Sequence, residues 1–340
     1  MFSLGFVGMV RPDGLTHGSV AANGIEIHYE EIGSGPLVVL CHGWPESWYS
    51  WRHQLRAIAD AGFRAVALHM RGYGLTTSPT DIDKYTITAI TGDVVGAIHG
   101  LGEESAVVVG HDWGAPAAWY SALVRPDVVR AVAALSVPFL PATGELPDGV
   151  TVNDLMRMVA GPDREYYRLF FQEPGIAEAD LERDVRTSML GLLYTFSGDV
   201  LLNGDRTEPH DGHFPAGSTF VESLSIPDAL PHWLTEDDLQ LYLDEITRTG
   251  FRGGLNWYRN LNRIPGCLAP WVGATIDQPS LYIGGSTDLI AGNTPEAIAT
   301  MEGALTDLRH CEILAGAGHW IQQERAGEVT DALVTFLRGL

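Results

Sequence analysis

The sequence predicts an α/β protein with a mostly parallel central sheet, helices on both faces and an inserted helical segment. Short apolar runs alternate with helix-like stretches as far as residue 138, which is typical of consecutive strand–helix–strand units. Helical patterns dominate from 139 to 266, and the alternation then resumes. We therefore expect one core made of residues 1–138 and 267–340, with 139–266 inserted as a helical cap over the carboxyl edge of the sheet.

The composition indicates a globular protein whose partners are neither nucleic acids nor membranes. With 340 residues, 45% of them hydrophobic, the chain can bury a large core. Its 43 acidic and 21 basic residues give a formal net charge of −22, which argues against nucleic acid and anionic membranes as partners. The acidic residues are scattered, so we interpret them as a soluble surface. The chain also lacks the run of about 20 apolar residues that a membrane span needs.

The cysteines and the N-terminus bear on the cellular compartment. Cys41, Cys267 and Cys311 are odd in number, and their spacing matches no metal site. We expect a reducing compartment, with Cys41 as a small core residue at the end of an apolar run. The apolar stretch over 1–10 has no basic residues before it and no small-residue cleavage site after it, so we do not interpret it as a signal peptide. These features predict a cytoplasmic protein.

The first half of the chain begins with a hairpin expected at a sheet edge. Two extended segments over 19–31 flank Asn23-Gly24, which is a signal for a tight type I′ turn. Thr86 is the predicted N-cap of a helix over 85–100. The other elements predicted here are strands over 36–41, 63–70, 107–110 and 128–137, and helices over 48–61 and 113–125.

The second half contains the cap and the rest of the core. A Pro- and Gly-rich segment over 203–218 has two interpretations, a cover over a ligand channel and a surface loop, of which we favour the surface loop. The helices expected in the cap span 153–160, 164–171, 177–193, 236–249 and 255–263, with no buried strand among them. The core elements expected after the cap are strands over 280–284 and 309–314, a helix over 294–301, and a final helix that packs through Val329, Leu333, Phe336 and Leu337.

The most informative stretch is Val107-Val108-Val109-Gly110-His111-Asp112-Trp113-Gly114. A β-branched run, a sharp turn and a helix follow one another, and Asp112 stands at the apex of the turn. This is the layout of the nucleophile elbow G-x-S-x-G of α/β-hydrolases, with aspartate in place of serine. A carboxylate nucleophile suits displacement at a saturated carbon, which forms an ester on the enzyme that water must then cleave.

Two further residues complete a candidate catalytic triad. Asp288 follows the strand predicted over 280–284, and His319 follows the strand predicted over 309–314. The order nucleophile, acid, histidine is that of α/β-hydrolases. A single Asp after a strand is more often a turn residue, and a single His is more often structural, but the three together favour catalysis. In this interpretation His319 activates water, and Asp288 orients His319.

The second step and the leaving group need hydrogen-bond donors. Cleavage of the ester creates an oxyanion, for which we expect the backbone N–H groups of Trp44 and Trp113 as donors, with Pro45 shaping the loop. A halide leaves with weak donors alone, whereas an epoxide oxygen benefits from a nearby acid. A phenol is protonated at neutral pH. The cap offers five such candidates, among which composition does not choose: Tyr166, Tyr167, Tyr194, Tyr242 and Tyr258.

Six segments of the chain resemble the soluble epoxide hydrolases. They are 42–51 (HGWPESWYSW), 70–74 (MRGYG), 110–114 (GHDWG), 167–178 (YRLFFQEPGIAE), 251–260 (FRGGLNWYRN) and 318–320 (GHW). The resemblance implies that Tyr167 and Tyr258 hold and protonate the epoxide oxygen and that the product is a vicinal diol. It also implies a cis peptide between Trp44 and Pro45, substrate contacts from Pro45, Phe171 and Trp257, and no need for a metal or an organic cofactor.

Two departures and two alternatives accompany this resemblance. Ala115 replaces the third glycine of the elbow, and His69 replaces an aspartate that commonly precedes the turn over 70–74. The first alternative is a haloalkane or haloacid dehalogenase with the same Asp nucleophile, which has no use for paired phenols. The second is a non-catalytic binding protein of the same fold, which would require an incomplete triad. The identity of the epoxide and the oligomeric state, with a homodimer as one option, are not predicted.

Overall fold

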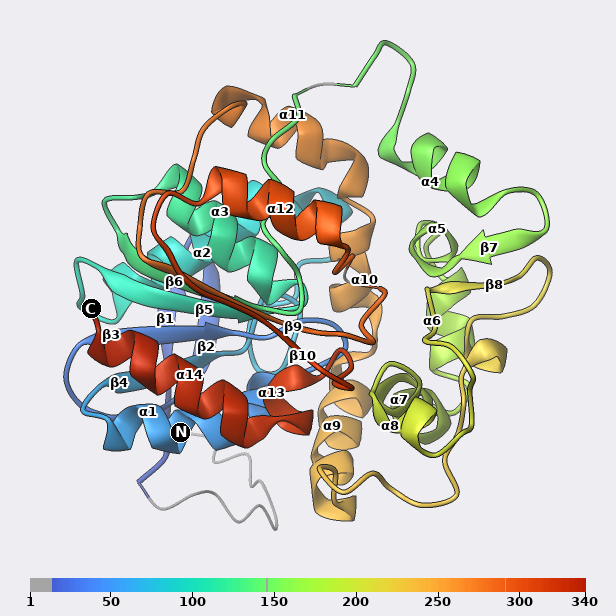
Figure 1. Cartoon of the computed structure of the whole chain (residues 1–340), viewed down its shortest axis with the longest axis horizontal. Coiled ribbons are helices and arrows are strands. Elements are labelled where there is room, and N and C mark those ends of the chain that lie inside the picture. Colours follow the sequence, from blue (N-terminus) through green and yellow to red (C-terminus); the bar gives the residue numbers. More distant parts are fainter. Residues whose placement is uncertain (1–13, 145, 291) are drawn as a thin grey trace.

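An eight-stranded sheet forms the centre of the computed structural model, which describes residues 14–340 except 145 and 291 (Figure 1). Its two antiparallel pairs, β1 with β2 and β2 with β4, lie at one edge, and all later neighbours are parallel. The predicted mostly parallel sheet is confirmed. In sheet order the strands are β1 (Thr16–Ala22), β2 (Ile25–Gly33), β4 (Arg64–Leu68), β3 (Leu37–Cys41), β5 (Ala106–His111), β6 (Val129–Leu135), β9 (Ser280–Gly285) and β10 (Leu308–Leu314).

Helices cover both faces of the sheet because its middle strands are apolar on both sides. Val107, Val108 and Val109 of β5 have no exposed surface. Val108 belongs to the core that contains α2, α3 and α12, while Val107 and Val109 belong to the core that contains α1 and α14 (Figure 1). The helices of the two layers are α1 (Arg52–Asp60), α2 (Ile87–Gly100), α3 (Gly114–Val124), α12 (Pro295–Ala304) and α14 (Ala326–Arg338).

Several local predictions in this core are confirmed. Asn23 and Gly24 both have positive φ, 47° and 78°, as a type I′ turn requires, and β1 is an edge strand. The Thr86 hydroxyl accepts a hydrogen bond from the backbone N–H of Ala89 at 3.2 Å, which makes it the N-cap of α2. Cys41 is fully buried. The four apolar residues predicted for the packing face of the final helix are buried in α14: Val329, Leu333, Phe336 and Leu337.

Most of the chain between β6 and β9 lies beyond one end of the sheet, at the right of Figure 1. This side receives the carboxyl ends of the parallel strands, where open α/β sheets place their ligands. The main elements of this segment are α4 (Val152–Ala160), β7 (Arg164–Tyr166), α5 (Tyr167–Phe170), α6 (Ile176–Leu181), α7 (Val185–Thr195), α8 (Asp199–Leu202), β8 (His213–Pro215), α9 (Glu236–Thr249), α10 (Arg252–Tyr258) and α11 (Ile264–Leu268).

The prediction of a helix over 164–171 is wrong in its first half. Arg164–Tyr166 is a strand that pairs antiparallel with β8, and only Tyr167–Phe170 is helical. The Tyr166 ring stacks on His213 of β8, with 4.6 Å between ring centroids, and such cross-strand pairs stabilise a sheet. A contact between residues far apart in sequence therefore overrides the local helical pattern.

Two other predictions in this segment need correction. The helix predicted over 177–193 is two helices, because the Asp184 side chain accepts a hydrogen bond from the Thr187 N–H and starts α7 anew. The segment over 203–218 is not simply a surface loop, because His210 and Phe214 are buried and it contributes β8. Within the described part of the chain, no helix combines the length and apolarity that crossing a membrane requires.

Candidate active site

Asp112 stands at the sharp turn between β5 and α3, with a φ of 51°. A Cβ atom on Gly110 would lie 1.9 Å from the carbonyl oxygen of Gly114, and one on Gly114 would lie 2.0 Å from that of Cys41. Because both distances are far inside van der Waals contact, only glycine fits either position. Ala115, the departure from the expected glycine, is fully buried in the first turn of α3. The turn thus presents the Asp112 carboxylate at the carboxyl edge of the sheet.

Loops that follow β9 and β10 bring Asp288 and His319 to the same edge. His319 Nδ1 lies 3.0 Å from Asp288 Oδ2, and His319 Nε2 lies 3.4 Å from Asp112 Oδ2. The side chains of Asp288 and His319 are 0% and 2% exposed, whereas that of Asp112 is 12% exposed. The structure therefore places an imidazole between two carboxylates, of which Asp112 retains the most access.

Asp112 and His319 hold each other in their charged forms. Burial lowers the pKa of His319, but the charge of Asp288 and the hydrogen bond and charge of Asp112 outweigh burial and raise this pKa to about 10. Burial likewise raises the pKa of Asp112, but the hydrogen bond and charge of His319 outweigh it and leave the pKa lowered. The resting site is an Asp112 carboxylate beside a His319 imidazolium.

The loop after β3 supplies one backbone donor directly to Asp112. The Trp44 N–H donates to Asp112 Oδ1 at 2.6 Å. A Cβ atom on Gly43 would lie 2.3 Å from Asp112 Oδ1, so a glycine is needed for this approach. The Trp44–Pro45 peptide is cis, as the resemblance implies, and Pro45 is buried. Trp113, the other predicted donor, follows Asp112 directly at the N-cap of α3.

Tyr167 and Tyr258 approach each other from α5 and α10. Their ring centroids are 5.8 Å apart, and the two residues are 4% and 3% exposed. Burial raises the pKa of both phenols, and the charge of Asp112 raises both further. The two phenols are therefore protonated and lie within electrostatic range of the Asp112 carboxylate. Their nearest ring neighbours include three aromatic side chains of the predicted site: Trp44, Trp113 and Phe171.

Phe171 and Trp257, predicted as substrate contacts, occupy different places in this aromatic cluster. The fully buried Phe171 ring lies 5.0 Å from Trp44 and 5.2 Å from Tyr258, between centroids. The Trp257 indole N–H donates to the backbone oxygen of Arg71 at 3.0 Å, so it ties α10 to the core. Phe171 thus lies beside both Trp44 and the Tyr258 ring, while the Trp257 ring lies against Trp113.

Comparison with known proteins identifies the family of this chain. Residues 36–326 match the family model for the α/β hydrolase fold. Epoxide hydrolase A of Mycobacterium tuberculosis is 42% identical over 325 residues, covering 94% of this chain and 97% of that protein. An epoxide hydrolase of Caballeronia sordidicola is 39% identical, covering 96% and 94%. The chain belongs to the epoxide hydrolase family.

Solved structures show the same relationship in three dimensions. An epoxide hydrolase from an endophytic Streptomyces superposes with a TM-score of 0.90 at 45% identity, covering 96% of each chain. Epoxide hydrolase A of Mycobacterium thermoresistibile superposes with a TM-score of 0.86 at 41% identity, covering 96% of this chain and 99% of that one. The fold and the enzyme class predicted from sequence are confirmed: this chain is a hydrolase of the epoxide hydrolase type with an α/β-hydrolase fold.

Ser136 is a residue of this enzyme's site that the sequence analysis missed. It follows β6, has a φ of 72°, and donates a hydrogen bond to Asp288 Oδ2. Its Oγ also lies 2.8 Å from His319 Nδ1. The signal that located Asp288, a polar residue directly after a buried strand, is present at Ser136 too. In the sequence, however, Ser136 falls inside the strand predicted over 128–137 rather than after it.

A buried pair that involves His111, the neighbour of Asp112 in the chain, was also missed. His111 Nδ1 lies 2.6 Å from Glu46 Oε2, and His111 Nε2 lies 2.7 Å from the backbone oxygen of His319. Gln322 and Gln323 donate to the other Glu46 oxygen at 2.9 and 3.0 Å. This network links the loop after β3, the turn at Asp112 and the His319 loop, so it fixes the positions of these three loops relative to one another.

Glu324 fastens the His319 loop to the chain between α7 and α8. Its carboxylate accepts hydrogen bonds from the N–H groups of Gly198, Gly318 and Trp320, each at 2.9 Å. Burial raises the pKa of Glu324 to about 7, although these donors oppose the increase. The His319 N–H adds a bond of 2.8 Å to the oxygen of Phe196. No local sequence signal marks Glu324, because one of its three partners, Gly198, lies in a distant part of the chain.

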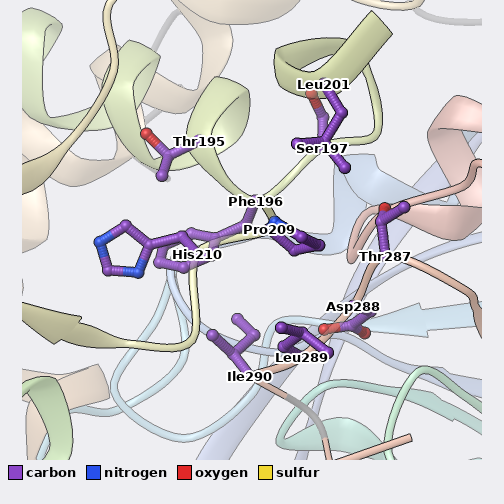
Figure 2. A pocket seen from close by; sticks show the side chains of 10 residues that line it. All are labelled: Thr195, Phe196, Ser197, Leu201, Pro209, His210, Thr287, Asp288, Leu289 and Ile290. Atoms are coloured by element: carbon purple, nitrogen blue, oxygen red, sulfur yellow. The ribbon is translucent and has the colours of Figure 1, made fainter. Parts of the chain in front are cut away.

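A crevice with an empty volume of about 210 Å³ lies beside the acid of this site. Figure 2 shows the Asp288 loop facing the chain after α7 and the segment around His210 across this space. Neither Asp112 nor the two phenols line it. The crevice therefore borders Asp288 and does not include Asp112. Among the residues that the structure describes, no group of three His, Cys, Asp or Glu side chains is placed to hold a metal ion.

Proposed function

We propose that this protein hydrolyses an epoxide to a vicinal diol through a covalent ester on Asp112. The observation that carries this proposal is a carboxylate paired with an Asp-oriented imidazole and within electrostatic range of two protonated phenols. The relatives named epoxide hydrolases at 39–42% identity support the substrate class. A dehalogenase with the same nucleophile, the alternative reaction, gives no role to Tyr167 and Tyr258.

Ring opening follows from the charges of the resting site. An oxygen of the Asp112 carboxylate attacks a ring carbon, a new carbon–oxygen bond forms, and the epoxide carbon–oxygen bond breaks with its electron pair on oxygen. The Tyr167 and Tyr258 hydroxyls hold that oxygen, and one of them transfers its proton to it. The low pKa of Asp112 keeps the nucleophile ionised, and the raised pKa values of the phenols keep the donors protonated.

Ester formation changes His319 from an acid to a base. Alkylation removes the negative charge of Asp112, and with it the hydrogen bond and the charge that help to raise the His319 pKa. With its pKa lowered, His319 loses a proton and can take one from water, while Asp288 still holds its Nδ1 side. The imidazole thus becomes a base at the stage of the reaction that needs one.

The second step returns every proton. Hydroxide from the activated water adds to the ester carbonyl carbon, and the oxyanion accepts from the N–H groups of Trp44 and Trp113. Collapse releases the diol oxygen, which takes the proton from His319. The Asp112 carboxylic acid then ionises, and its proton restores the phenol. His319 takes back from solvent the proton that it released there after alkylation, which restores the imidazolium of the resting site.

The same proposal gives a role to the chain outside the triad. We propose that residues 139–266 act as a cap on the core of 1–138 and 267–340, because this segment supplies both phenols. Pro45 and Phe171 then line the substrate space, with Trp257 behind them. The reactants are a small-molecule epoxide and water, and each step uses only side chains and backbone groups of this chain. A homodimer and a cytoplasmic location stay predictions.

A single turnover in ¹⁸O-water tests the covalent route. With enzyme in excess of epoxide, we expect unlabelled diol and one ¹⁸O atom in the peptide that contains Asp112, measured by mass spectrometry. Label in the first diol would show that water attacks the epoxide directly and would refute the ester. Tyr167→Phe/Tyr258→Phe should slow alkylation of Asp112 strongly and leave the fold intact. Turnover of haloalkanes in place of epoxides would favour the dehalogenase alternative.

A further inference from the structure

Arg168 lies next to one phenol of the pair and binds it. Its Nε–H donates to the Tyr167 hydroxyl oxygen at 2.9 Å. Its Nη2 donates to the backbone oxygen of Ile290 at 3.0 Å, which anchors the guanidinium to the loop that carries Asp288. The guanidinium carbon lies 5.5 Å from the centroid of the Tyr167 ring and 5.8 Å from that of Tyr166. Two hydrogen bonds and two ring faces therefore fix its position.

The charge of Arg168 is directed at phenols rather than at a carboxylate. Within the described ranges 14–144, 146–290 and 292–340, no carboxylate oxygen lies within 4.0 Å of this guanidinium. Other arginines of the same segment have such partners: Arg259 pairs with Glu178 at 2.8 Å, and Arg164 pairs with Asp211 at 2.6 Å. In a protein of net charge −22, carboxylates are abundant, yet the partly buried Arg168 pairs with none of those that the structure describes. Arg168 therefore has a role other than forming an ion pair with a carboxylate.

The two phenols consequently differ. Burial raises the pKa of Tyr167, and the charge and hydrogen bond of Arg168 oppose that increase. For Tyr258, burial and the charges of Asp112 and Tyr167 raise the pKa, and Arg168 opposes them through its charge but not through a hydrogen bond. Tyr167 is the phenol whose ionised form is stabilised by a direct, charge-assisted hydrogen bond, a type about twice as strong as a neutral one.

We propose that Arg168 is a positioning residue that makes Tyr167, rather than Tyr258, the proton donor in ring opening. This inference rests on the proposed function. The Arg168 Nε–H occupies one lone pair of the Tyr167 oxygen, so the Tyr167 O–H hydrogen is left to point toward the substrate oxygen. Tyr258 then holds the same oxygen by hydrogen bonding without losing its proton.

The proton-transfer step is balanced by groups in the site. As the Asp112 oxygen bonds to the ring carbon, the electron pair of the breaking carbon–oxygen bond passes to the epoxide oxygen. That oxygen takes the Tyr167 proton, and the resulting phenolate is stabilised by the Arg168 guanidinium. Ester hydrolysis by His319 does not use this proton transfer. Loss of Arg168 should therefore slow alkylation and leave the hydrolytic step almost unchanged.

A different use of this cation would be to bind the carboxylate of an acidic epoxide substrate. Nε and Nη2 of Arg168 already donate to Tyr167 and Ile290, so the guanidinium is held against the phenol, which favours the role in proton transfer. The two roles differ in one measurable respect. A carboxylate anchor affects only acidic substrates, whereas a partner of Tyr167 affects neutral epoxides equally.

The test is a double-mutant cycle on the alkylation rate. In single-turnover stopped-flow with neutral styrene oxide, Arg168→Gln should slow alkylation about 10- to 100-fold, as expected for loss of a hydrogen bond to a charged group. The rate of ester hydrolysis should change less than about 3-fold, since a bond to the phenol has no part in that step. In a Tyr167→Phe background, Arg168→Gln should have little further effect, while in a Tyr258→Phe background it should keep its full effect.

Control variants separate this inference from structural damage and from the proposed function. Arg168→Lys keeps the charge and a donor, so it should retain more alkylation activity than Arg168→Gln, and it serves if the latter does not fold. Arg164→Gln removes a neighbouring surface ion pair and should change neither rate. Full additivity with Tyr167→Phe, or an effect confined to carboxylated epoxides, would overturn the role of Arg168. Normal alkylation in Tyr167→Phe/Tyr258→Phe would instead overturn the proposed function.

Discussion

The charge of Asp112 should account for much of the high pKa of His319, and Asp112→Asn tests this directly. His319 Nε2 and Asp112 Oδ2 are 3.4 Å apart. At that distance two unit charges interact by roughly 5 kcal/mol in an effective dielectric of about 20. Since a change of one in pKa corresponds to roughly 1.4 kcal/mol, this interaction is equivalent to a pKa change of about 3.5. An amide keeps part of the dipole, so the His319 pKa should fall by about 2 to 3, from about 10 to about 7–8.

The assay is an NMR titration of the histidine side chains in the wild type and in Asp112→Asn. Asp127→Asn, which removes an exposed surface carboxylate, is the matched control and should leave the His319 pKa unchanged. A His319 pKa in Asp112→Asn within one unit of the wild-type value would refute the reasoning. It would mean that alkylation of Asp112 does not convert His319 into a base.

The same perturbation has a stability signature with a definite sign. The folded-state pKa of His319 is raised above its ordinary value of 6.5, so its protonation stabilises the fold fully below pH 6.5. This contribution is lost as the pH rises from about 6.5 to about 10. Asp112→Asn lowers the folded-state pKa of His319, so the pH range over which this stabilisation is lost becomes narrower. The Tm of the variant should therefore fall less steeply between pH 6.5 and about 10 than the Tm of the wild type. Groups common to both proteins cancel in the comparison.

Two further predictions concern the loops that hold the site. Glu324→Ala leaves three buried N–H donors without their acceptor and should lower the free energy of unfolding by about 3 kcal/mol or more, measured by urea denaturation; a loss below about 1 kcal/mol would show that water replaces the carboxylate. Gly110→Ala places a Cβ atom 1.9 Å from a backbone oxygen and should prevent folding, whereas Gly303→Ala on α12 meets nothing within 4 Å and should be neutral or slightly stabilising. A folded Gly110→Ala protein with normal circular dichroism would contradict the steric account.

The family resemblance and the order of the elements account for what could be predicted of the site. Asp112, Asp288 and His319 each follow a strand of the parallel part of the sheet, and parallel strands that end at one edge must bring such residues together. The tyrosines were selected by resemblance alone, because a cap tyrosine carries no local mark of its role. Strand β7 was mispredicted because its partner β8 lies about 50 residues away, beyond the range of any local pattern.

The sequence by itself determined the strand–turn–helix of the nucleophile, since a β-branched run, two close-approach glycines and the helix after them act within a few residues of one another. Only the tertiary structure decided which polar groups support it. Glu324 binds Gly198, 126 positions away, and Arg168 reaches Ile290, 122 positions away. Such partners are chosen by how the segment 139–266 packs on the sheet, and that packing depends on many weak contacts at once rather than on any one stretch of chain.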